Sequence, residues 1–365
     1  MRCADVKVAI VGAGMSGLSL AVALAARGIE VVVHEAAAEP PSARTFCGFE
    51  VEGHPFEAAV GHRWSRVAVA RRGGTIERAL TEHPYAKIDG RAFVDEALRQ
   101  LEGAGATLRF EAPVSDVRTL DASHVFDSRP IRSEGALLQQ FVGRFVRTEA
   151  PRFDPDRAML MDFRVDQSRG VHFLYVLPTS ETEALVEDTY FSRQPLDAAI
   201  FEGTLGRALE PLGPLEVLAS EEGTIPMSTE RPPPAPPRVT RIGVAGGVAK
   251  PSTGYAFLFA QRHARAIADA LSRGEKPPAT VRRPRDRFLD EIFLARIEAE
   301  PAEAYQLFVR LFENMEGDRL ARFLSECARP SDLLQVVTAL PMGPFTGEAL
   351  RTLGRAALGR GPAPL

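Results

Sequence analysis

The sequence predicts an α/β fold in which a parallel β-sheet domain, assembled from separate stretches of chain, is combined with an interleaved antiparallel sheet and C-terminal helices. A strand, a glycine-rich turn, a helix and a second strand open the chain, and a similar strand–glycine–helix pattern begins near residue 242. Strand-forming segments lie between these patterns, and apolar residues recur at helical spacing beyond residue 276. We therefore expect a first domain from residues 1–60, 85–135 and 240–275, a sheet domain from 61–84 and 136–239, and a helical region from 276–365.

The composition is that of an ordinary globular protein, with 365 residues, 45% of them hydrophobic and 25% charged. The formal net charge of −4 provides no basic field for nucleic acid. The three cysteines and seven histidines show neither a disulfide framework nor metal-ligand spacing, so we expect no metal site. Because the sequence has no signal peptide and no run of about 18 apolar residues, we expect a cytoplasmic protein that is dissolved or lies on a membrane surface.

The first pattern begins with the apolar strand Val8–Val11, which runs directly into a G-x-G-x-x-G turn. The glycines of this turn are Gly12, Gly14 and Gly17. The helix Ser16–Arg27 follows and ends near Gly28, a residue type common just after helix C-termini. A second strand, Ile29–Val33, then leads to Glu35.

This arrangement is typical of a Rossmann-type dinucleotide-binding fold. The glycines allow a sharp turn and a close approach of the backbone to a pyrophosphate, and the helix N-terminus supplies free N–H groups and a positive dipole end. Glu35 is placed to accept hydrogen bonds from an adenosine ribose, and its charge disfavours a 2′-phosphate. The predicted dinucleotide-binding residues of this half of the site are Gly12, Gly14, Ser16, Gly17 and Glu35.

The second pattern is expected to close over the same cofactor from far along the chain. Ile242–Ala245 reads as a short buried strand, followed by two glycines, a loop and a helix from about Gly254. Flavoproteins of the hydroxylase and reductase type hold FAD in this split way, and no second nicotinamide fingerprint is present, so we predict FAD without a separate NAD(P)H domain. The predicted flavin-binding residues here are Gly246, Gly247, Pro251, Ser252, Thr253, Gly254 and Tyr255. Tyr255 and Phe257 fit a pocket wall and a plain core equally well.

Several further blocks of the sequence resemble the bacterial lycopene β-cyclases and their relatives, flavoproteins of carotenoid synthesis. The blocks include GAGMSGLSLA, HPYAKIDGRAF, FLYVLPTSETEALVEDTYFS, EEGTIPM and AGGVAKPSTGYAF, and together they span nearly the whole chain. The aromatic hydroxylases usually carry Gly-Asp where this chain has Gly246-Gly247, and Ala-Asp-Gly where it has Asp127-Ser128-Arg129. The chain departs from the cyclases at Arg44–Gly48, where the family often has Thr-Trp, and this segment is expected to line the flavin or substrate pocket.

The resemblance also selects a candidate acid. Glu187 and Asp188 lie in the expected strand Ala184–Ser192, where neighbouring side chains point to opposite faces, and the strand pattern alone does not decide which acid is inside. The family's essential acid falls on Glu187. Glu222 in EEGTIPM is a second candidate for proton transfer, and Arg91 matches a family position near the flavin.

The chemistry that the resemblance implies is the cyclisation of a lycopene end group without net oxidation or reduction. An acid protonates the terminal double bond, and reduced FAD either stabilises the resulting cation or relays the proton; NAD(P)H is the expected external reductant. A carboxyl group in an apolar pocket stays protonated near neutral pH because burial disfavours its charged form. A flavin oxidoreductase, an inactive carotenoid-binding protein and a cyclase of another polyprenyl chain remain as alternatives.

Because a linear carotenoid is insoluble in water, the resemblance implies a protein that sits peripherally on the inner face of the cell membrane. The expected C-terminal helices include a face formed by Leu307, Phe308, Leu311, Phe312 and Met315. This face has two interpretations: packing against the FAD domain, or part of an apolar tunnel or membrane-facing surface.

Overall fold

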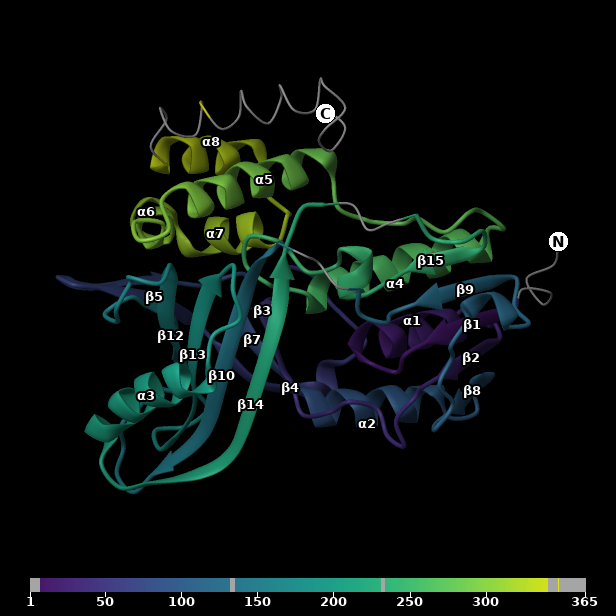
Figure 1. The fold of residues 1–365 in the computed structure, drawn as a ribbon, viewed down its shortest axis with the longest axis horizontal. Coiled ribbons are helices and arrows are strands. Elements are labelled where there is room, and N and C mark those ends of the chain that lie inside the picture. The colour runs from purple at the N-terminus through teal and green to yellow at the C-terminus, as the bar shows by residue number, and fades with distance from the viewer. Residues whose placement is uncertain (1–6, 132–134, 231–233, 341–346, 348–365) are drawn as a thin grey trace.

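The computed structural model describes residues 7–131, 135–230, 234–340 and 347, and these residues form three β-sheets with helices on their faces (Figure 1). Residues 341–346 and 348–365 of the predicted helical region and residues 231–233 of the proline-rich segment 230–239 lie outside the described residues. The parallel-sheet part, the long antiparallel sheet and the C-terminal helices are the three bodies of the molecule in Figure 1. In the described residues no helix has the length and apolar character needed to cross a bilayer.

A five-stranded sheet in the order β15-β9-β1-β2-β8 forms the Rossmann-type part, and all of its strand pairs are parallel. The strands are β1 Val8–Val11, β2 Val31–His34, β8 Ala106–Arg109, β9 His124–Asp127 and β15 Val239–Arg241. Three helices share a hydrophobic core with this sheet: α1 Met15–Ala25, α2 Gly90–Leu101 and α4 Phe257–Ser272. The strands come from widely separated parts of the chain, as the split pattern predicts, and the predicted fold class is confirmed.

The second strand–glycine–helix pattern is displaced from its predicted position. The strand predicted at 242–245 is instead β15, which ends at Arg241, and Val244–Gly246 form a 3₁₀ turn. Gly243 has φ +67° and Gly247 has φ +72°, and this left-handed backbone turns the chain away from an extended path. The helix begins at Phe257 rather than Gly254, because Gly254 also has a positive φ.

A seven-stranded sheet in the order β14-β10-β13-β12-β11-β5-β6 lies beside the parallel sheet (Figure 1). All of its pairs are antiparallel except β11 with β5. Its strands are β5 Arg66–Arg71, β6 Gly74–Ala79, β10 Leu137–Thr148, β11 Arg157–Asp162, β12 Val171–Pro178, β13 Glu183–Ser192 and β14 Leu215–Met227. Helix α3, Ala198–Leu209, covers one face, where Leu205 packs with residues of β10 and β13. A small antiparallel sheet contains β3 Thr45–Phe49, β7 Tyr85–Asp89 and β4 Val60–Trp64.

Four helices make up the described C-terminal region: α5 Pro284–Ala299, α6 Tyr305–Asn314, α7 Gly317–Leu324 and α8 Pro330–Ala339. The apolar face predicted at 307–315 is buried, so the packing interpretation is correct, but its expected partner is wrong. Leu307, Phe308 and Leu311 share a core with Val67 and Val69 of β5, in the seven-stranded sheet. Helix α6 contacts β5 and β6, so its apolar face is covered by the seven-stranded sheet and not by the parallel sheet.

Candidate active site

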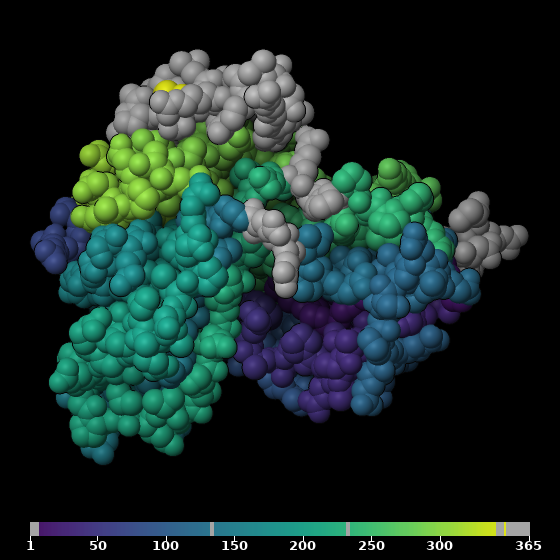
Figure 2. Space-filling model, in the orientation of Figure 1, coloured from purple at the N-terminus to yellow at the C-terminus, as the bar shows by residue number. Residues whose placement is uncertain are grey.

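A cavity of about 650 Å³ lies between the parallel sheet and the seven-stranded sheet. Figure 2 shows the molecular surface hollowed between these two lobes. The cavity is lined by the N-terminus of α1, by β3, by the loop before α4, and by residues of β10, β12, β13 and β14. Both halves of the predicted cofactor site and the strand of the candidate acid therefore meet at one cavity.

The glycine turn has the geometry that dinucleotide binding requires. Gly12 has φ +97°, and a Cβ added there would lie 2.2 Å from the Ser128 Oγ. A Cβ on Gly17 would lie 1.9 Å from the carbonyl oxygen of Gly12, so this position must be glycine for α1 to pack on the turn. Gly14 is open, with the Pro41 Cγ at 3.8 Å as its nearest neighbour, and it lines the cavity together with Ser16. The turn thus presents bare backbone and a helix N-terminus to the cavity.

Glu35 lies beside the glycine turn and is bonded to it. Its carboxylate accepts a hydrogen bond of 2.7 Å from the backbone N–H of Ala13 in the turn and one of 3.0 Å from the N–H of Ala37. These bonds fix the acid beside the glycine turn, which is where an acid that binds a ribose is found in dinucleotide-binding folds.

The loop before α4 supplies the other half. Gly254 has φ +74°, and a Cβ there would lie 2.3 Å from the Oε1 of Gln139. This Gln139 oxygen is buried in the cavity wall and has no hydrogen-bond partner among the described residues. Thr253 and Tyr255 also line the cavity. The loop thus offers a close backbone approach and an acceptor that a bound group would satisfy.

Gly12, Gly17 and Glu35 shape the glycine turn without lining the cavity, and five further predicted cofactor residues also lie away from this surface. Gly246 is buried against the carbonyl oxygen of Arg241, and Gly247 is exposed. Pro251 is buried, and the Ser252 hydroxyl donates to the Asp290 Oδ1 at 2.6 Å on the far side of the loop. Arg91 is exposed and pairs with Asp95 on α2 at 3.1 Å. These five residues shape or flank the site, and a role in cofactor binding stays a prediction.

Strand β13 places its two acids on opposite faces of the sheet, and both are buried. Glu187 is 8% exposed and lines the cavity. Asp188 is fully buried on the α3 side, where its Oδ1 lies 2.6 Å from the Nε2 of His172. The acid inside the cavity is therefore Glu187, while Asp188 forms a buried pair behind the sheet.

A row of residues crosses the sheet at Glu187. The strand register places Tyr175 of β12 and Gly143 of β10 on either side of Glu187, and Glu221 of β14 opposite Gly143. A Cβ on Gly143 would lie 3.3 Å from the Glu221 Cγ and 3.5 Å from the Glu187 Cβ. The nearest atom to that position is the Leu185 Cδ1 at 2.9 Å, so glycine at 143 leaves room for Leu185 and for the two glutamate side chains on either side.

The environment keeps Glu187 protonated. Burial, reinforced by the nearby charge of Glu221, raises the pKa of Glu187 to about 8, although the Thr189 hydroxyl opposes this by donating a hydrogen bond of 2.9 Å. Burial also raises the pKa of Glu221, but the N–H of Thr45 donates to its carboxylate at 3.0 Å and the Lys87 and Arg44 cations act in the opposite direction.

Of the two adjacent acids in EEGTIPM, sequence reasoning selected Glu222 rather than Glu221 for proton transfer. Glu222 also lines the cavity, but it is exposed, whereas Glu221 is only 9% exposed. Along a strand only alternate residues share a face, so Glu221 shares the Glu187 face and Glu222 does not. The signal that would have identified Glu221 is the pairing of β10 with both β13 and β14, which a single sequence does not contain.

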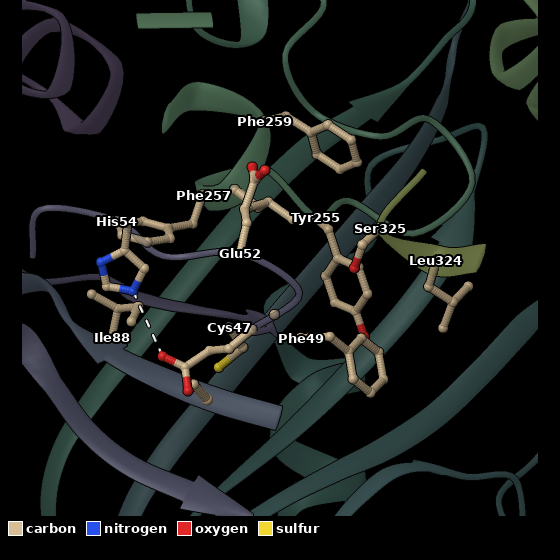
Figure 3. Close-up of a pocket in the computed structure, with 14 residues that line it drawn as sticks. Cys47, Phe49, Glu52, His54, Ile88, Tyr255, Phe257, Phe259, Leu324 and Ser325 are labelled. Carbon is tan, nitrogen blue, oxygen red and sulfur yellow. Dashed lines mark ion pairs between the residues drawn. The ribbon is translucent and has the colours of Figure 1, made fainter. Parts of the chain in front are cut away.

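Phenols and a thiol form the wall beside Glu187. The Tyr85 and Tyr175 hydroxyls lie 2.7 Å apart, and the Tyr255 ring lies 6.1 Å from the Tyr85 ring. Burial raises the pKa of all three phenols, and it raises the pKa of the Cys47 thiol to about 12. The wall is therefore uncharged at neutral pH. Figure 3 shows Cys47 and Tyr255 in a small adjoining hollow of about 30 Å³.

The same hollow borders a group of potential metal ligands, Glu50, His54 and Glu57, whose ligand atoms lie within 4.8 Å of one another. Arg63 forms ion pairs with both carboxylates of this group, and Figure 3 marks the contact of His54 with Glu50. Both acids are thus already engaged in ion pairs with an arginine.

Comparison with known proteins identifies the family. A family model described as lycopene cyclase protein matches residues 7–349. The chain belongs to the lycopene cyclase family. A lycopene β-cyclase of Paracoccus sp. strain N81106 is 29% identical over 306 residues, which cover 74% of this chain and 75% of the relative. The lycopene β-cyclase of Pantoea ananas is 26% identical, covering 81% of this chain and 83% of that protein. The resemblance inferred from the sequence blocks is confirmed.

Solved structures agree with the fold. A geranylgeranyl bacteriochlorophyll reductase-like protein from Thermoplasma acidophilum aligns with a TM-score of 0.64 at 14% identity, covering 96% of this chain and 98% of that one. Aklavinone-11 hydroxylase, solved with FAD and aklavinone, aligns with a TM-score of 0.52 at 15% identity, covering 90% of this chain and 72% of that one. At these identities the alignments establish the flavoprotein-type fold.

Proposed function

We propose that this protein is a flavin-dependent cyclase that closes an end group of a linear carotenoid such as lycopene into a β-ionone ring, without net oxidation or reduction. The observation that carries the proposal is the position of Glu187, a carboxyl group with a pKa of about 8 that lines the cavity to which the dinucleotide turn also contributes. Family membership and the lycopene β-cyclase relatives support the carotenoid substrate.

The residues around the cavity fit FAD. We propose that the backbone of Gly12–Gly17 and the N-terminus of α1 hold the pyrophosphate, that Glu35 holds the adenosine ribose, and that Thr253 and Gly254 lie against the flavin. The Gln139 Oε1, which has no hydrogen-bond partner among the described residues, could accept a hydrogen bond from the bound flavin. Reduced FAD, when bound, would supply a negative charge near a carbocation, and the FAD of aklavinone-11 hydroxylase supports the choice of cofactor.

In this proposal Glu187 donates the initiating proton. At pH 7 a carboxyl group of pKa about 8 is protonated in about ten molecules for each one ionised. A proton is then available at neutral pH without any strong acid. Because the acid faces a wall of uncharged phenols and apolar side chains, bulk water has little access to the cation that forms. The apolar part of this wall includes Leu160, Met161, Phe173, Leu185 and Phe191.

We further propose that residues 1–60, 85–135 and 240–275 act as the FAD-binding domain, that 61–84 and 136–239 hold the substrate, and that NAD(P)H reduces the flavin from outside. The protein would collect its substrate at the inner face of the cell membrane, because a linear carotenoid partitions into lipid.

Anaerobic incubation with lycopene in liposomes, after reduction of the bound FAD by dithionite, tests the proposal. The expected product has the mass of lycopene and the absorption of a β-ring carotenoid, while the flavin spectrum stays that of the reduced form. Oxidation of the flavin in step with lycopene loss would instead make the protein a flavin oxidoreductase. If lycopene is unchanged while reduced FAD is bound, lycopene is not the substrate, and other polyprenyl chains should be tested as substrates.

A further inference from the structure

The cavity contains two acids that the fold brings together from distant parts of the chain. β13 and β14 both pair with β10, and Gly143 is opposite Glu187 on one side and Glu221 on the other. Both acids line the cavity, and both are at least nine-tenths buried. A Cβ at Gly143 would lie 2.9 Å from the Leu185 Cδ1, 3.3 Å from the Glu221 Cγ and 3.5 Å from the Glu187 Cβ, so both glutamate side chains pass the same glycine on the same face of the sheet. The two acids therefore serve one cavity, and the charge of Glu221 acts on Glu187.

The two carboxyl groups have different surroundings. Glu187 accepts one hydrogen bond from the neutral Thr189 hydroxyl and faces the negative charge of Glu221. Glu221 accepts the backbone N–H of Thr45 and lies near the cations Lys87 and Arg44. Two buried acids whose charges act on each other in one cavity hold a single negative charge at neutral pH more readily than two. The N–H of Thr45 and the nearby cations stabilise the negative charge on Glu221, so the shared proton resides on Glu187.

We propose that Glu221 is the base that ends the reaction: it accepts the proton that the cyclised cation loses, and this proton then returns to Glu187 beside Gly143. The inference rests on the proposed cyclase function. It assigns to Glu221 the proton transfer that the sequence pattern attached to Glu222.

The steps balance without any co-reactant. The O–H bond of Glu187 breaks as a C–H bond forms at the terminal double bond, whose electron pair makes the new bond. An internal double bond then attacks the cation and forms the ring C–C bond. A C–H bond next to the new cationic carbon breaks, its electron pair becomes the ring double bond, and its proton passes to the Glu221 carboxylate. Transfer of that proton to Glu187 restores the starting state, so the product keeps the formula of the substrate.

Three variants of β14 test this role: Glu221→Gln, Glu221→Asp and Glu216→Gln. Glu216 is exposed on the same strand, pairs with Arg147 and lies outside the residues that line the cavity, so it is the matched control. With lycopene and reduced FAD, we expect Glu221→Gln to lower turnover by at least about 100-fold, the usual contribution of a general base. The residual products should include ring isomers or alcohols, because the cation loses a different proton or captures water.

Glu221→Asp keeps a carboxylate and is expected to restore the single wild-type product at a reduced rate, whereas Glu216→Gln should match the wild type. A second readout does not depend on turnover: the infrared band of the protonated Glu187 carboxyl, followed against pH and assigned with Glu187→Gln. The loss of the Glu221 charge should move the titration of Glu187 to lower pH. A residue with only a structural role, through its bond to Thr45, would leave the product composition unchanged, whereas the titration reports the coupling of the two carboxyl groups.

Wild-type turnover and product composition in Glu221→Gln, with no change in the Glu187 titration, would overturn the inference while leaving the cyclase function intact. If wild-type protein fails to convert lycopene, the proposed function fails instead, and the infrared titration still decides whether the two carboxyl groups are coupled. If Glu221→Gln does not fold, Glu221→Asp decides: a mixed set of products there would contradict the assignment of Glu221 as the base.

Discussion

The buried Glu187 is expected to destabilise the protein at alkaline pH, and its replacement by glutamine should remove this cost. Burial and the charge of Glu221 raise its pKa from 4.5 to about 8. The native state therefore keeps a proton that the unfolded chain releases near pH 4.5. Because the native state binds more protons across this window, the free energy of unfolding falls as the pH rises from about 4.5 to about 8.

The size of the effect follows from the shift in pKa. A difference of about 3.5 units corresponds to about 5 kcal/mol at 1.36 kcal/mol per unit, an upper value because Glu221 titrates together with Glu187. With an unfolding entropy of about 2.1 cal/mol/K per residue, 1 kcal/mol is about 1.3 °C for a chain of this length. The Tm of Glu187→Gln minus the Tm of the wild type should therefore increase by up to about 6 °C as the pH rises from 4.5 to 9.

Differential scanning calorimetry of the cofactor-free proteins at pH 4.5, 7 and 9 measures this difference. The Glu216→Gln variant is the control, since its side chain is exposed and its charge is screened by solvent. Taking the difference between variant and wild type cancels the titration of every group that is not coupled to Glu187. A Tm difference that does not change with pH would refute the reasoning, because it would mean that Glu187 is ionised in the folded protein at neutral pH.

Three further predictions concern the cofactor loop and the acid. Gly254→Ala should lose flavin binding, measured by quenching of flavin fluorescence, because its Cβ would lie 2.3 Å from the Gln139 Oε1; Gly274→Ala, also at positive φ but with nothing within 4 Å, should retain it. Lys250→Met should destabilise the protein by about 3–5 kcal/mol in urea unfolding, since it leaves the buried Asp290 with one cation fewer; unchanged stability would mean that the Lys250–Asp290 pair, 2.5 Å apart, contributes nothing. Turnover should fall about tenfold per pH unit above about pH 8 as Glu187 ionises, and an activity that stays level to pH 10 would exclude Glu187 as the proton donor.

Local patterns in the sequence predicted the features that depend on neighbouring residues. The turn at Gly12–Gly17, the acid Glu35 and the opposite orientation of Glu187 and Asp188 all follow from the geometry of a single strand or turn, and the structure agrees with them. The family resemblance then selected Glu187, which the strand pattern alone left undecided.

Features that depend on long-range pairing were missed. Glu221 meets Glu187 only because β10 pairs with both β13 and β14, and the role of Gly143 depends on that same register. The sequence likewise assigned the α6 face to the wrong neighbour, because helical periodicity indicates that a face is buried but not what covers it.

The measurement that tests the central claim most directly is deuterium incorporation during turnover in D₂O, with lycopene and reduced FAD under argon. Because the exchangeable proton of Glu187 becomes a deuteron when the enzyme is equilibrated in D₂O, the ring formed in a single turnover by excess wild-type enzyme should carry one deuterium at the protonated carbon. Glu187→Gln, with FAD still bound, should form no ring and incorporate no deuterium. Single-turnover rings without deuterium, or deuterated rings made by Glu187→Gln at the wild-type rate, would contradict proton donation by Glu187.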